Sequence, residues 1–273
     1  MRWTPGDRSN VEDARGRSGL GVVGVPIGIG GFLVLLLLSW ATGTNFFALL
    51  GTGDTPPTNA VGSSGQVQST PQEDRLIDFV DAVMNDVQRT WQELLGDRYQ
   101  PTRVVIFRNT LQSGCGMAQS ATGPFYCPGD SRVYLDLGFF RELAEKFGAP
   151  GDFAQAYVVA HEVGHHVQHL LGISGPSVAI ELQADCFAGV WGHAASQPGR
   201  ASRGEVELDP GDAEEGLNAA AAIGDDRLQR MATGHVQPER FTHGSSAQRV
   251  AAFRRGLDSG RPAACQTGAT TTH

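Results

Sequence analysis

An uncharged stretch near the N-terminus limits how this chain can fold more than any other feature of its sequence. No Asp, Glu, Lys or Arg occurs between Arg17 and Asp54, and residues 20–40 read LGVVGVPIGIGGFLVLLLLSW. About 20 apolar residues are enough to cross the hydrocarbon core of a membrane as a helix, in which Gly and Pro are tolerated. We therefore expect a transmembrane anchor at residues 19–41.

Two other interpretations of this stretch stay open, and the flanking charges give an orientation to the first. A cleaved signal peptide has a shorter apolar region and an A-x-A-like site, and a buried core helix is the third possibility. Loops with an excess of Lys and Arg stay in the cytoplasm. The N-terminus is therefore expected in the cytoplasm and the bulk of the chain outside, in a single-pass cell-membrane protein. The basic residues before the span are Arg2, Arg8, Arg15 and Arg17, and the first one after it is Arg75.

The rest of the chain divides by composition into polar flanks and one domain. Residues 1–18 form a polar tail, expected in the cytoplasm, and residues 42–71 are rich in Gly, Ser, Thr and Pro, as flexible linkers are. Residues 72–267 are expected to fold as one domain, followed by a disordered tail at 268–273. The net charge of −8, with Lys146 as the single lysine, argues against a nucleic-acid-binding protein.

Hydrophobic periodicity predicts an α+β domain that is mainly helical and has a small β-sheet. Asp152 is expected to cap the helix that follows it, with Gln155 as its capping-box partner. Helical spacing predicts helices at residues 73–95, 139–147, 152–171 and 178–195 and from Asp209 or Asp212 to Gly224, and alternation predicts strands at 103–107 and 133–137.

The four cysteines suit two disulfides in an oxidising compartment. Cys115 and Cys127 are close in sequence and form the natural local pair, which leaves Cys186 with Cys265. Zinc binding by these cysteines is disfavoured because no C-x-x-C spacing occurs.

Residues 161–165 form an H-E-x-x-H motif within an apolar, helix-compatible segment. On a helix, His161 and His165 lie on one face and can bind one ion. A catalytic zinc site has three protein ligands and keeps one position for water, and Glu162 would act on that water as a general base. Because the motif alone also fits a helix with an exposed pair of histidines, a third ligand is needed to decide.

Glu181 is the predicted third ligand, in an E-x-x-x-D pattern that also contains Asp185. Beyond the turn that begins at Gly172, a second helix can return antiparallel and present both acids to the histidines. Asp185 can then accept the free ring N–H of a liganding His. A solvated helix face is the alternative, but unpaired carboxylates are costly among apolar neighbours. These neighbours are Ile180, Leu182, Cys186 and Phe187.

Two further histidines, His166 and His169, are near the motif. His165 and His169 are also four residues apart, but the first is not followed by Glu as in H-E-x-x-H. We therefore expect His166 and His169 on the surface.

Several segments together resemble the bacterial putative neutral zinc metallopeptidase family. The resemblance covers nearly all of the chain from about residue 72 to Cys265, and the layout of anchor and linker is similar. It implies a zincin-like, minigluzincin-type domain with a gluzincin-type site, in which His161, His165 and Glu181 bind Zn²⁺ and Glu162 is the base. The segments are residues 113–130, 133–140, 148–173, 181–195 and 241–249.

A more distant similarity to membrane gluzincins of the CAAX prenyl protease type concerns His243 and Arg249. Those enzymes carry T-H-P after their E-x-x-x-D, and an Arg six residues beyond the His; this chain has Gly244 in place of the Pro. The similarity implies that His243 stabilises the oxyanion, while Arg249 orders that loop or binds an acidic group. A surface His in a polar loop is the alternative. The other histidines considered for this role are His193 and His235.

Gluzincins typically bind an extended peptide along an edge strand that precedes the metal-binding helix, and residues 133–137 are the candidate for that strand. An ordinary buried strand is the alternative.

The predicted function is a membrane-anchored zinc metalloendopeptidase that acts on protein or peptide substrates, without a nucleic-acid partner. One alternative is a non-catalytic, zinc-containing, membrane-tethered binding protein, which would not need Glu162. The other is a non-peptide zinc amidohydrolase, which the motif fits equally well.

Overall fold

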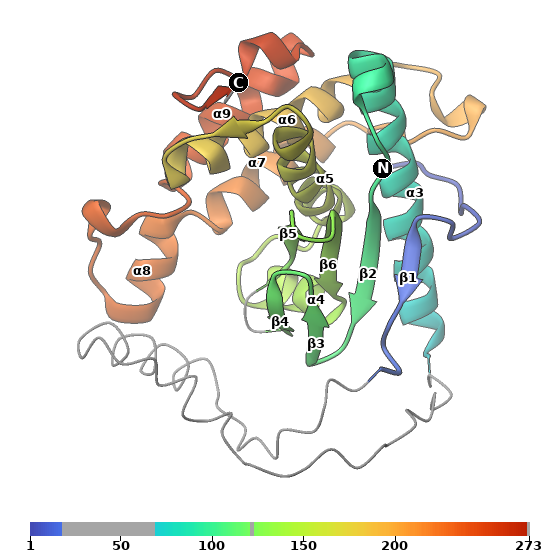
Figure 1. Cartoon of the computed structure of the whole chain (residues 1–273), viewed down its shortest axis with the longest axis horizontal. Helices are drawn as coiled ribbons and strands as arrows, with labels where there is room; N and C mark the ends of the chain where they lie inside the picture. The colour runs from blue at the N-terminus through green and yellow to red at the C-terminus, as the bar shows by residue number, and fades with distance from the viewer. Residues whose placement is uncertain (18–68, 121–122, 272–273) are drawn as a thin grey trace.

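The computed structural model describes residues 1–17, 69–120 and 123–271 of the chain. These residues form a mainly helical α+β fold in which helices cover a small sheet (Figure 1). The predicted anchor at residues 19–41, and the linker as far as residue 68, lie outside the described residues. Within the ranges that are described, no helix is both long and apolar enough to cross a membrane.

The main sheet has the strand order β1-β2-β6-β5. β1 and β2 are parallel, as are β2 and β6, whereas β5 is antiparallel to β6 and lies at one edge. The strand predicted at 133–137 is thus β6, which has a partner on both sides, so it is not the edge strand expected to bind a peptide. β5 holds the edge position instead. The strands of the sheet are β1 (Val11–Asp13), β2 (Arg103–Phe107), β5 (Phe125–Cys127) and β6 (Arg132–Asp136).

The two faces of the sheet contact different parts of the molecule. Because side chains alternate along a strand, Val104 and Ile106 of β2 face the helical core, while Val105 and Phe107 face a separate small cluster. That cluster includes Ala118 from the hairpin of β3 (Thr110–Ser113) and β4 (Gly116–Gln119). The predicted disulfide between Cys115, in the turn of this hairpin, and Cys127 of β5 is present.

Three of the helices pack closely around the core of the domain. α5 packs against α6, and α6 packs against α9. At the crossing of α6 and α9, a Cβ on Gly256 would lie 1.9 Å from the carbonyl oxygen of Cys186, so only glycine fits there. The second predicted disulfide, between Cys186 and Cys265, reinforces this region. The helices are α3 (Pro71–Leu95), α4 (Gly138–Glu145), α5 (Asp152–Leu170), α6 (Ser177–Ala195), α7 (Asp212–Ala222), α8 (Asp225–Thr233) and α9 (Ser246–Ser259).

The helices predicted from the sequence are present within a few residues, but one predicted cap is wrong. The N-cap of α5 is Gly151, and no side chain caps it; Asp152 is the first residue of the helix. A capping box instead begins α3, where the Thr70 hydroxyl and the Glu73 carboxylate each accept a backbone N–H. At the start of α5, the Glu215 carboxylate of α7 accepts the Phe153 N–H at 3.2 Å, and local spacing could not reveal this partner from another helix.

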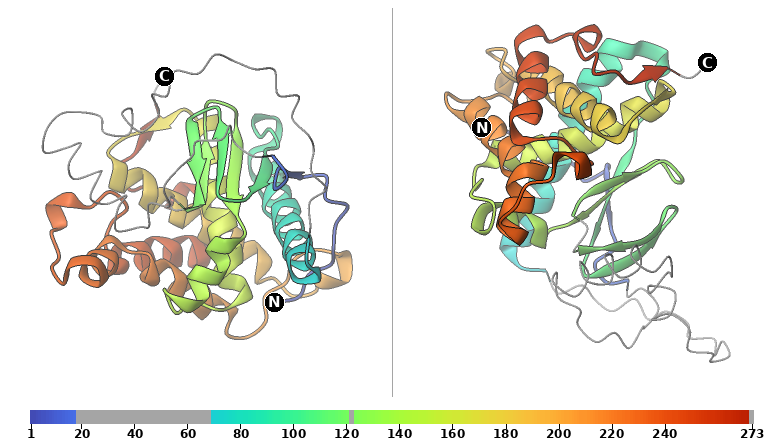
Figure 2. Two further views of the ribbon diagram at one scale, coloured as in Figure 1. Left: turned by 90° about the horizontal axis from the view of Figure 1, so that it is seen from below. Right: turned by 90° about the vertical axis from the view of Figure 1, so that its left-hand side faces the viewer.

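Residues 1–17 pack on the domain, which differs from the separate tail expected from the sequence. Val11 of β1 is paired with Val104, and the Trp3 ring contacts Phe79 of α3 edge-on at 5.4 Å between centroids. Figure 2 shows this N-terminal segment beside α3. The pairing is long-range and the segment is mostly polar, so hydrophobic periodicity could not reveal it.

Ion pairs hold the same segment in place. The α-ammonium group of Met1 lies 3.0 Å from Asp152 and 3.3 Å from Asp212, at the first residues of α5 and α7. Arg8 Nε donates to Asp78 at 2.6 Å. At the other end of the chain, Thr270–Thr271 pair with Ile173–Ser174, although a disordered tail was expected from residue 268.

Candidate metal centre

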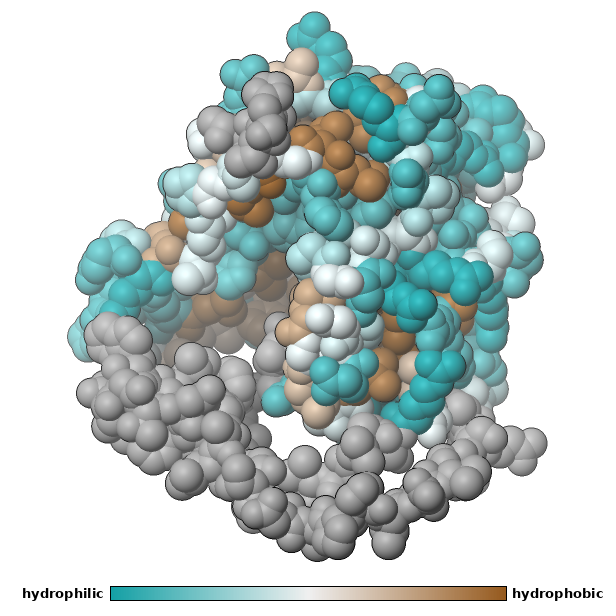
Figure 3. All heavy atoms as spheres, in the orientation of Figure 1, coloured by the Kyte–Doolittle hydropathy of each residue, from teal (hydrophilic) through white to brown (hydrophobic). Residues whose placement is uncertain are grey.

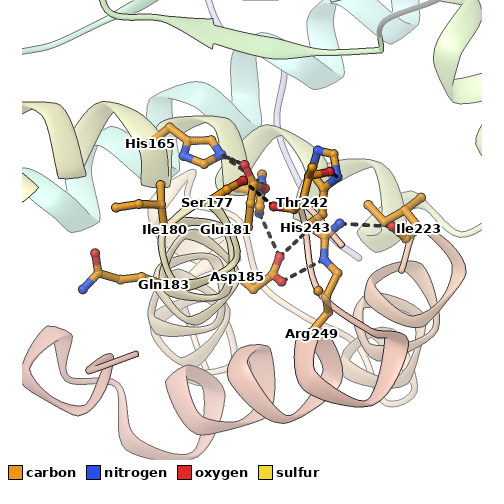
Figure 4. A network of polar contacts seen from close by, with 12 residues as sticks. His165, Ser177, Ile180, Glu181, Gln183, Asp185, Ile223, Thr242, His243 and Arg249 are labelled. Carbon is orange, nitrogen blue, oxygen red and sulfur yellow. Dashed lines mark hydrogen bonds and ion pairs between the residues drawn. The ribbon is translucent and has the colours of Figure 1, made fainter. Parts of the chain in front are cut away.

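The metal centre is formed where α5 and α6 cross closely. A Cβ on Gly164, within the H-E-x-x-H motif, would lie 3.0 Å from the carbonyl oxygen of Ala184. The missing side chain lets the two helices approach until the acids of α6 face the histidines of α5. Figure 4 shows Glu181 and Asp185 one turn apart on α6, with Glu181 directed toward His165.

Three potential ligand atoms converge on one point. His161 Nε2 lies 3.1 Å from His165 Nε2 and 3.2 Å from Glu181 Oε2, and His165 Nε2 lies 3.6 Å from Glu181 Oε1. Ligands about 2.0–2.1 Å from a tetrahedral zinc ion are roughly 3.3–3.4 Å apart. The observed spacing therefore fits a two-His, one-carboxylate zinc site, and the structure brings the three predicted ligands together.

Hydrogen bonds at Nδ1 fix the orientation of both imidazole rings. His161 Nδ1 donates to Asp185 Oδ1 at 2.8 Å, and His165 Nδ1 donates to Gln168 Oε1 at 2.9 Å. Gln168 can only accept through Oε1, because its amide nitrogen donates to the Ile180 carbonyl at 2.7 Å. Both Nε2 atoms are thereby left to face each other, an arrangement that a cation between them stabilises.

Asp185 is itself held by two buried groups. Arg249 of α9 donates to both of its oxygens at 2.9 Å, and the Tyr157 hydroxyl donates to Oδ1 at 2.5 Å. Asp185 is fully buried and Arg249 is 2% exposed. Arg249, expected to order a loop or bind an acid, therefore binds the acid that supports His161, and it also donates to the Ile223 carbonyl.

The charges in this centre call for a cation. Arg249 is hydrogen-bonded to Asp185, whereas the ion-pair partners of Glu181 among the described residues are His161 and His165. Although burial opposes ionisation, hydrogen bonds from His161 and His165 hold the pKa of Glu181 well below its usual range. Burial alone would lower the pKa of His161, but Asp185 and Glu181 raise it to about 10. A proton or a metal ion is thus strongly favoured at this point.

Glu162 lies next to these ligands and is kept free. Its side chain lines the same cleft as His161 and His165, although the residue is only 7% exposed. No hydrogen bond or ion pair to the Glu162 carboxylate is found among the residues that the structure describes. A nearly buried carboxylate without a protein partner is suited to hold a water molecule.

His243 approaches the centre on a loop that one carboxylate organises. Asp225 Oδ2 accepts the backbone N–H groups of Thr242, His243 and Gly244 at 2.7, 2.7 and 3.0 Å. The hydrogen bond from His243 Nδ1 to Asp225 Oδ1, at 3.3 Å, raises the pKa of His243 above its ordinary value. Since Nδ1 is engaged, the other ring nitrogen is available to the cleft, which His243 also lines. Gly244, with φ +93°, adopts a conformation that proline cannot.

An open cleft of about 780 Å³ connects these residues. Figure 3 shows hydrophobic atoms in a hollow between α8 and the strands. β5 contributes Phe125 and Tyr126, whereas α4 and α8 contribute Phe139 and Leu228. Of the two alternatives to His243, neither His193 nor His235 lines the cleft; His193 donates to the Leu257 carbonyl at 2.7 Å.

Several residues of the centre had no signal in the sequence analysis. Tyr157 and Asp225 act through hydrogen bonds to residues at least 17 positions away in the chain. Gln168 acts on His165, three residues before it, and this helical spacing could have suggested its role. His166, expected on the surface, is 2% exposed and donates from Nε2 to the Gln100 carbonyl. The expectation for His166 was wrong because its buried partner belongs to another segment.

Comparisons with known proteins agree with this chemistry. A profile of the family described as "Putative neutral zinc metallopeptidase" matches residues 1–268. The "Uncharacterized protein YpfJ" of Escherichia coli is 44% identical over 98% of both chains. The "Uncharacterized protein Rv2575" of Mycobacterium tuberculosis is 45% identical over 68% of both chains. No solved structure shows a significant match.

Proposed function

Because the chain belongs to the family of putative neutral zinc metallopeptidases, we propose that it is a zinc-dependent endopeptidase. The observation that carries this proposal is the geometry of the centre: three ligand atoms at the spacing of a zinc site beside a carboxylate without a protein partner. A structural zinc site would not need Glu162 in the cleft.

Each residue of the metal centre has a separate role in the proposed amide hydrolysis. His161, His165 and Glu181 would hold Zn²⁺, which supplies Lewis acidity toward a water molecule and the substrate carbonyl. Glu162 accepts a proton from the attacking water and delivers it to the leaving amine nitrogen. His243, whose pKa is raised by its hydrogen bond to Asp225, donates a hydrogen bond from its other ring nitrogen to the developing oxyanion.

A peptide is the substrate that the cleft suits best. β5 is at the edge of the sheet and lines the cleft, so an extended peptide can pair with it as an added strand. Two charged residues of the cleft already have partners: Arg249 binds Asp185, and Glu142 binds Lys146 at 2.7 Å. Glu162 and Glu181, the other two carboxylates of the lining, belong to the proposed metal centre. The described lining residues thus offer no further carboxylate or guanidinium group to bind a chain terminus, which favours cleavage within a chain.

The proposal is tested with the purified full-length chain and its Glu162→Gln variant. We expect about one zinc per wild-type chain and cleavage of members of a mixed peptide library. The variant should keep its zinc and lose about 10²–10⁴-fold in rate, as loss of a general base does. A zinc-loaded wild type that cleaves no peptide, or a variant that cleaves as fast as the wild type, would disprove the proposal.

We also propose that the protein is attached to a membrane through residues 19–41 and that its domain lies outside the cytoplasm. The two disulfides support an oxidising compartment. The pairing of Val11–Asp13 with β2 supports one change to the expected topology: residues 1–17 lie on the same side as the domain. A single crossing with the tail in the cytoplasm would require this pairing to break.

Topology reporters fused to each terminus in turn distinguish the two arrangements. Reporters that both register outside the cytoplasm support our proposal, whereas two reporters in the cytoplasm would contradict it. An N-terminal reporter in the cytoplasm combined with a C-terminal reporter outside it would contradict the proposal and favour a single crossing.

A further inference from the structure

A chain of hydrogen bonds links the backbone to His169, at one end of the cleft. The Gln100 carbonyl lies 2.6 Å from His166 Nε2, His166 Nδ1 lies 3.0 Å from Tyr126 Oη, and Tyr126 Oη lies 2.7 Å from His169 Nδ1. Tyr126 belongs to the edge strand β5, while His166 and His169 are one turn apart on α5. The chain of hydrogen bonds thus connects two of the elements that line the cleft, β5 and α5.

The direction of each hydrogen bond follows from its chemistry. A carbonyl oxygen can only accept, so the tautomer of His166 that makes this hydrogen bond is the one with its proton on Nε2. Its Nδ1 is then an acceptor, which must receive the single hydroxyl proton of Tyr126. The Tyr126 oxygen in turn accepts from His169 Nδ1–H. His169 Nε2 is left with a lone pair, so it acts as a hydrogen-bond acceptor.

The position of His169 suits contact with a bound substrate. His169 is exposed and lines the cleft together with Tyr126 and Ile173. It follows His165 by four residues and His161 by eight, which is about 6 and 12 Å along a helix axis. At about 3.3 Å per residue of extended peptide, these distances correspond to roughly two to four substrate residues.

We propose that His169 is a substrate-binding residue whose Nε2 accepts a hydrogen bond from a main-chain amide of the peptide, two or more residues from the scissile bond. Tyr126 and His166 are positioning residues that fix the acceptor tautomer. The inference rests on the proposed peptidase function and adds that the enzyme recognises a peptide long enough to reach His169. A short amide would not reach it.

Two substitutions at position 169 separate the roles of the two ring nitrogens. In His169→Asn, the amide nitrogen replaces Nδ1 as the donor to Tyr126, but no acceptor reaches the position of Nε2. In His169→Gln, the side-chain oxygen reaches the position of Nε2, while the bond to Tyr126 is lost. His235→Asn is the matched control, since His235 is exposed and does not line the cleft.

Steady-state kinetics of the zinc-loaded full-length chain are measured with an octapeptide and a tetrapeptide that share one scissile pair. For His169→Asn we expect KM for the octapeptide to rise about 3- to 10-fold, as loss of one hydrogen bond does. The value of kcat should stay within about twofold, and His169→Gln should be less affected. An unchanged KM for the octapeptide, or an equal loss with both peptides, would overturn the proposal.

Binding measurements and spectroscopy test the role of His169 without depending on peptide cleavage. Calorimetry in the Glu162→Gln background measures octapeptide affinity without turnover, so weaker binding after His169→Asn supports the subsite even if the wild type cleaves nothing. If Glu162→Gln binds no peptide, the subsite and the peptidase function both fail. Nitrogen-15 spectra of histidine-labelled protein should show His166 protonated at Nε2 and His169 at Nδ1. The opposite tautomer of His169 would overturn the proposal.

Discussion

The metal centre and the contact site of the N-terminal segment, residues 1–17, both bring acids from a neighbouring helix next to α5, but the two groups of acids meet different cations. Carboxylate oxygens of Asp152, Asp212 and Glu215 lie within 4.8 Å of one another, as the ligand atoms of the metal centre also do. In that acidic cluster the Met1 ammonium group contacts Asp152 and Asp212, so a cation from the chain supplies the charge. The ion-pair partners of Glu181 in the described part of the chain are instead two imidazoles, those of His161 and His165.

Proximity of acids therefore does not by itself make a metal site. Asp185 and Gln168 direct two imidazoles toward Glu181, whereas none of the described imidazoles is grouped with the acidic cluster. The comparison predicts that changes at the metal centre alter zinc binding and catalysis, and that changes in the N-terminal segment alter stability alone.

The largest effect in this comparison is expected from the oxyanion donor. Replacing His243 with Gln should lower kcat by about 10²-fold, because a hydrogen bond to the transition state is lost. Zinc content should stay the same, since His243 is not among the grouped ligands. Kinetics and metal analysis check this result, with His235→Gln as the control outside the cleft. A variant with unchanged kcat would remove His243 from the mechanism.

Zinc affinity should discriminate between the two groups of acids. Asp185→Asn should weaken zinc binding about 10- to 100-fold, because the support behind a ligand His is lost. Glu215→Gln, in the acidic cluster, should leave zinc affinity unchanged. Competition with a chromophoric chelator measures both values. Equal losses in the two variants would mean that the acidic cluster also binds zinc.

The pH dependence of the zinc-free protein tests the charge of the centre. The folded-state pKa of His161, about 10, is above the ordinary value of 6.5. The stabilisation from protonated His161 is therefore fully present below about pH 6.5 and is lost as the pH rises toward 10. The melting temperature of zinc-free protein should fall over this range more steeply than that of His161→Gln. Parallel curves would contradict the high pKa of His161.

The smallest effect is expected in the N-terminal segment. Trp3→Ala should lower the free energy of unfolding by about 1 kcal/mol, because the edge-on contact with Phe79 is lost. Zinc affinity and kcat should not change, and Trp3→Phe should retain part of the stability. Denaturant titration measures the difference. Loss of zinc binding in Trp3→Ala would show that the N-terminal segment and the metal centre are coupled.

The same comparison explains what the sequence could and could not predict. The metal-binding residues follow helical spacing, and Glu181 and Asp185 are acids among apolar neighbours, so local pattern and burial cost indicated them. β1, in contrast, is the polar sequence Val11–Asp13, and its pairing with β2 depends on residues more than 90 positions away.

The order of the strands in the sheet and the partners of the long-range hydrogen bonds could not be predicted from local sequence patterns either. Residues 133–137 alternate as an edge strand would, and only the position of β5 in the sheet showed that the edge lies elsewhere. Asp225 organises the His243 loop by accepting three backbone N–H groups, and the spacing of side chains in the sequence does not indicate such hydrogen bonds. His166 has its partner in the Gln100 carbonyl, which any residue type would supply.

The zinc position itself tests this account most directly. Crystals of the zinc-loaded full-length protein, measured at the zinc absorption edge, should show one anomalous peak about 2.0–2.1 Å from His161 Nε2, His165 Nε2 and a Glu181 oxygen. Glu162 should lie beside that peak without touching it. A peak between Asp152, Asp212 and Glu215, or none between the two imidazoles, would contradict the account.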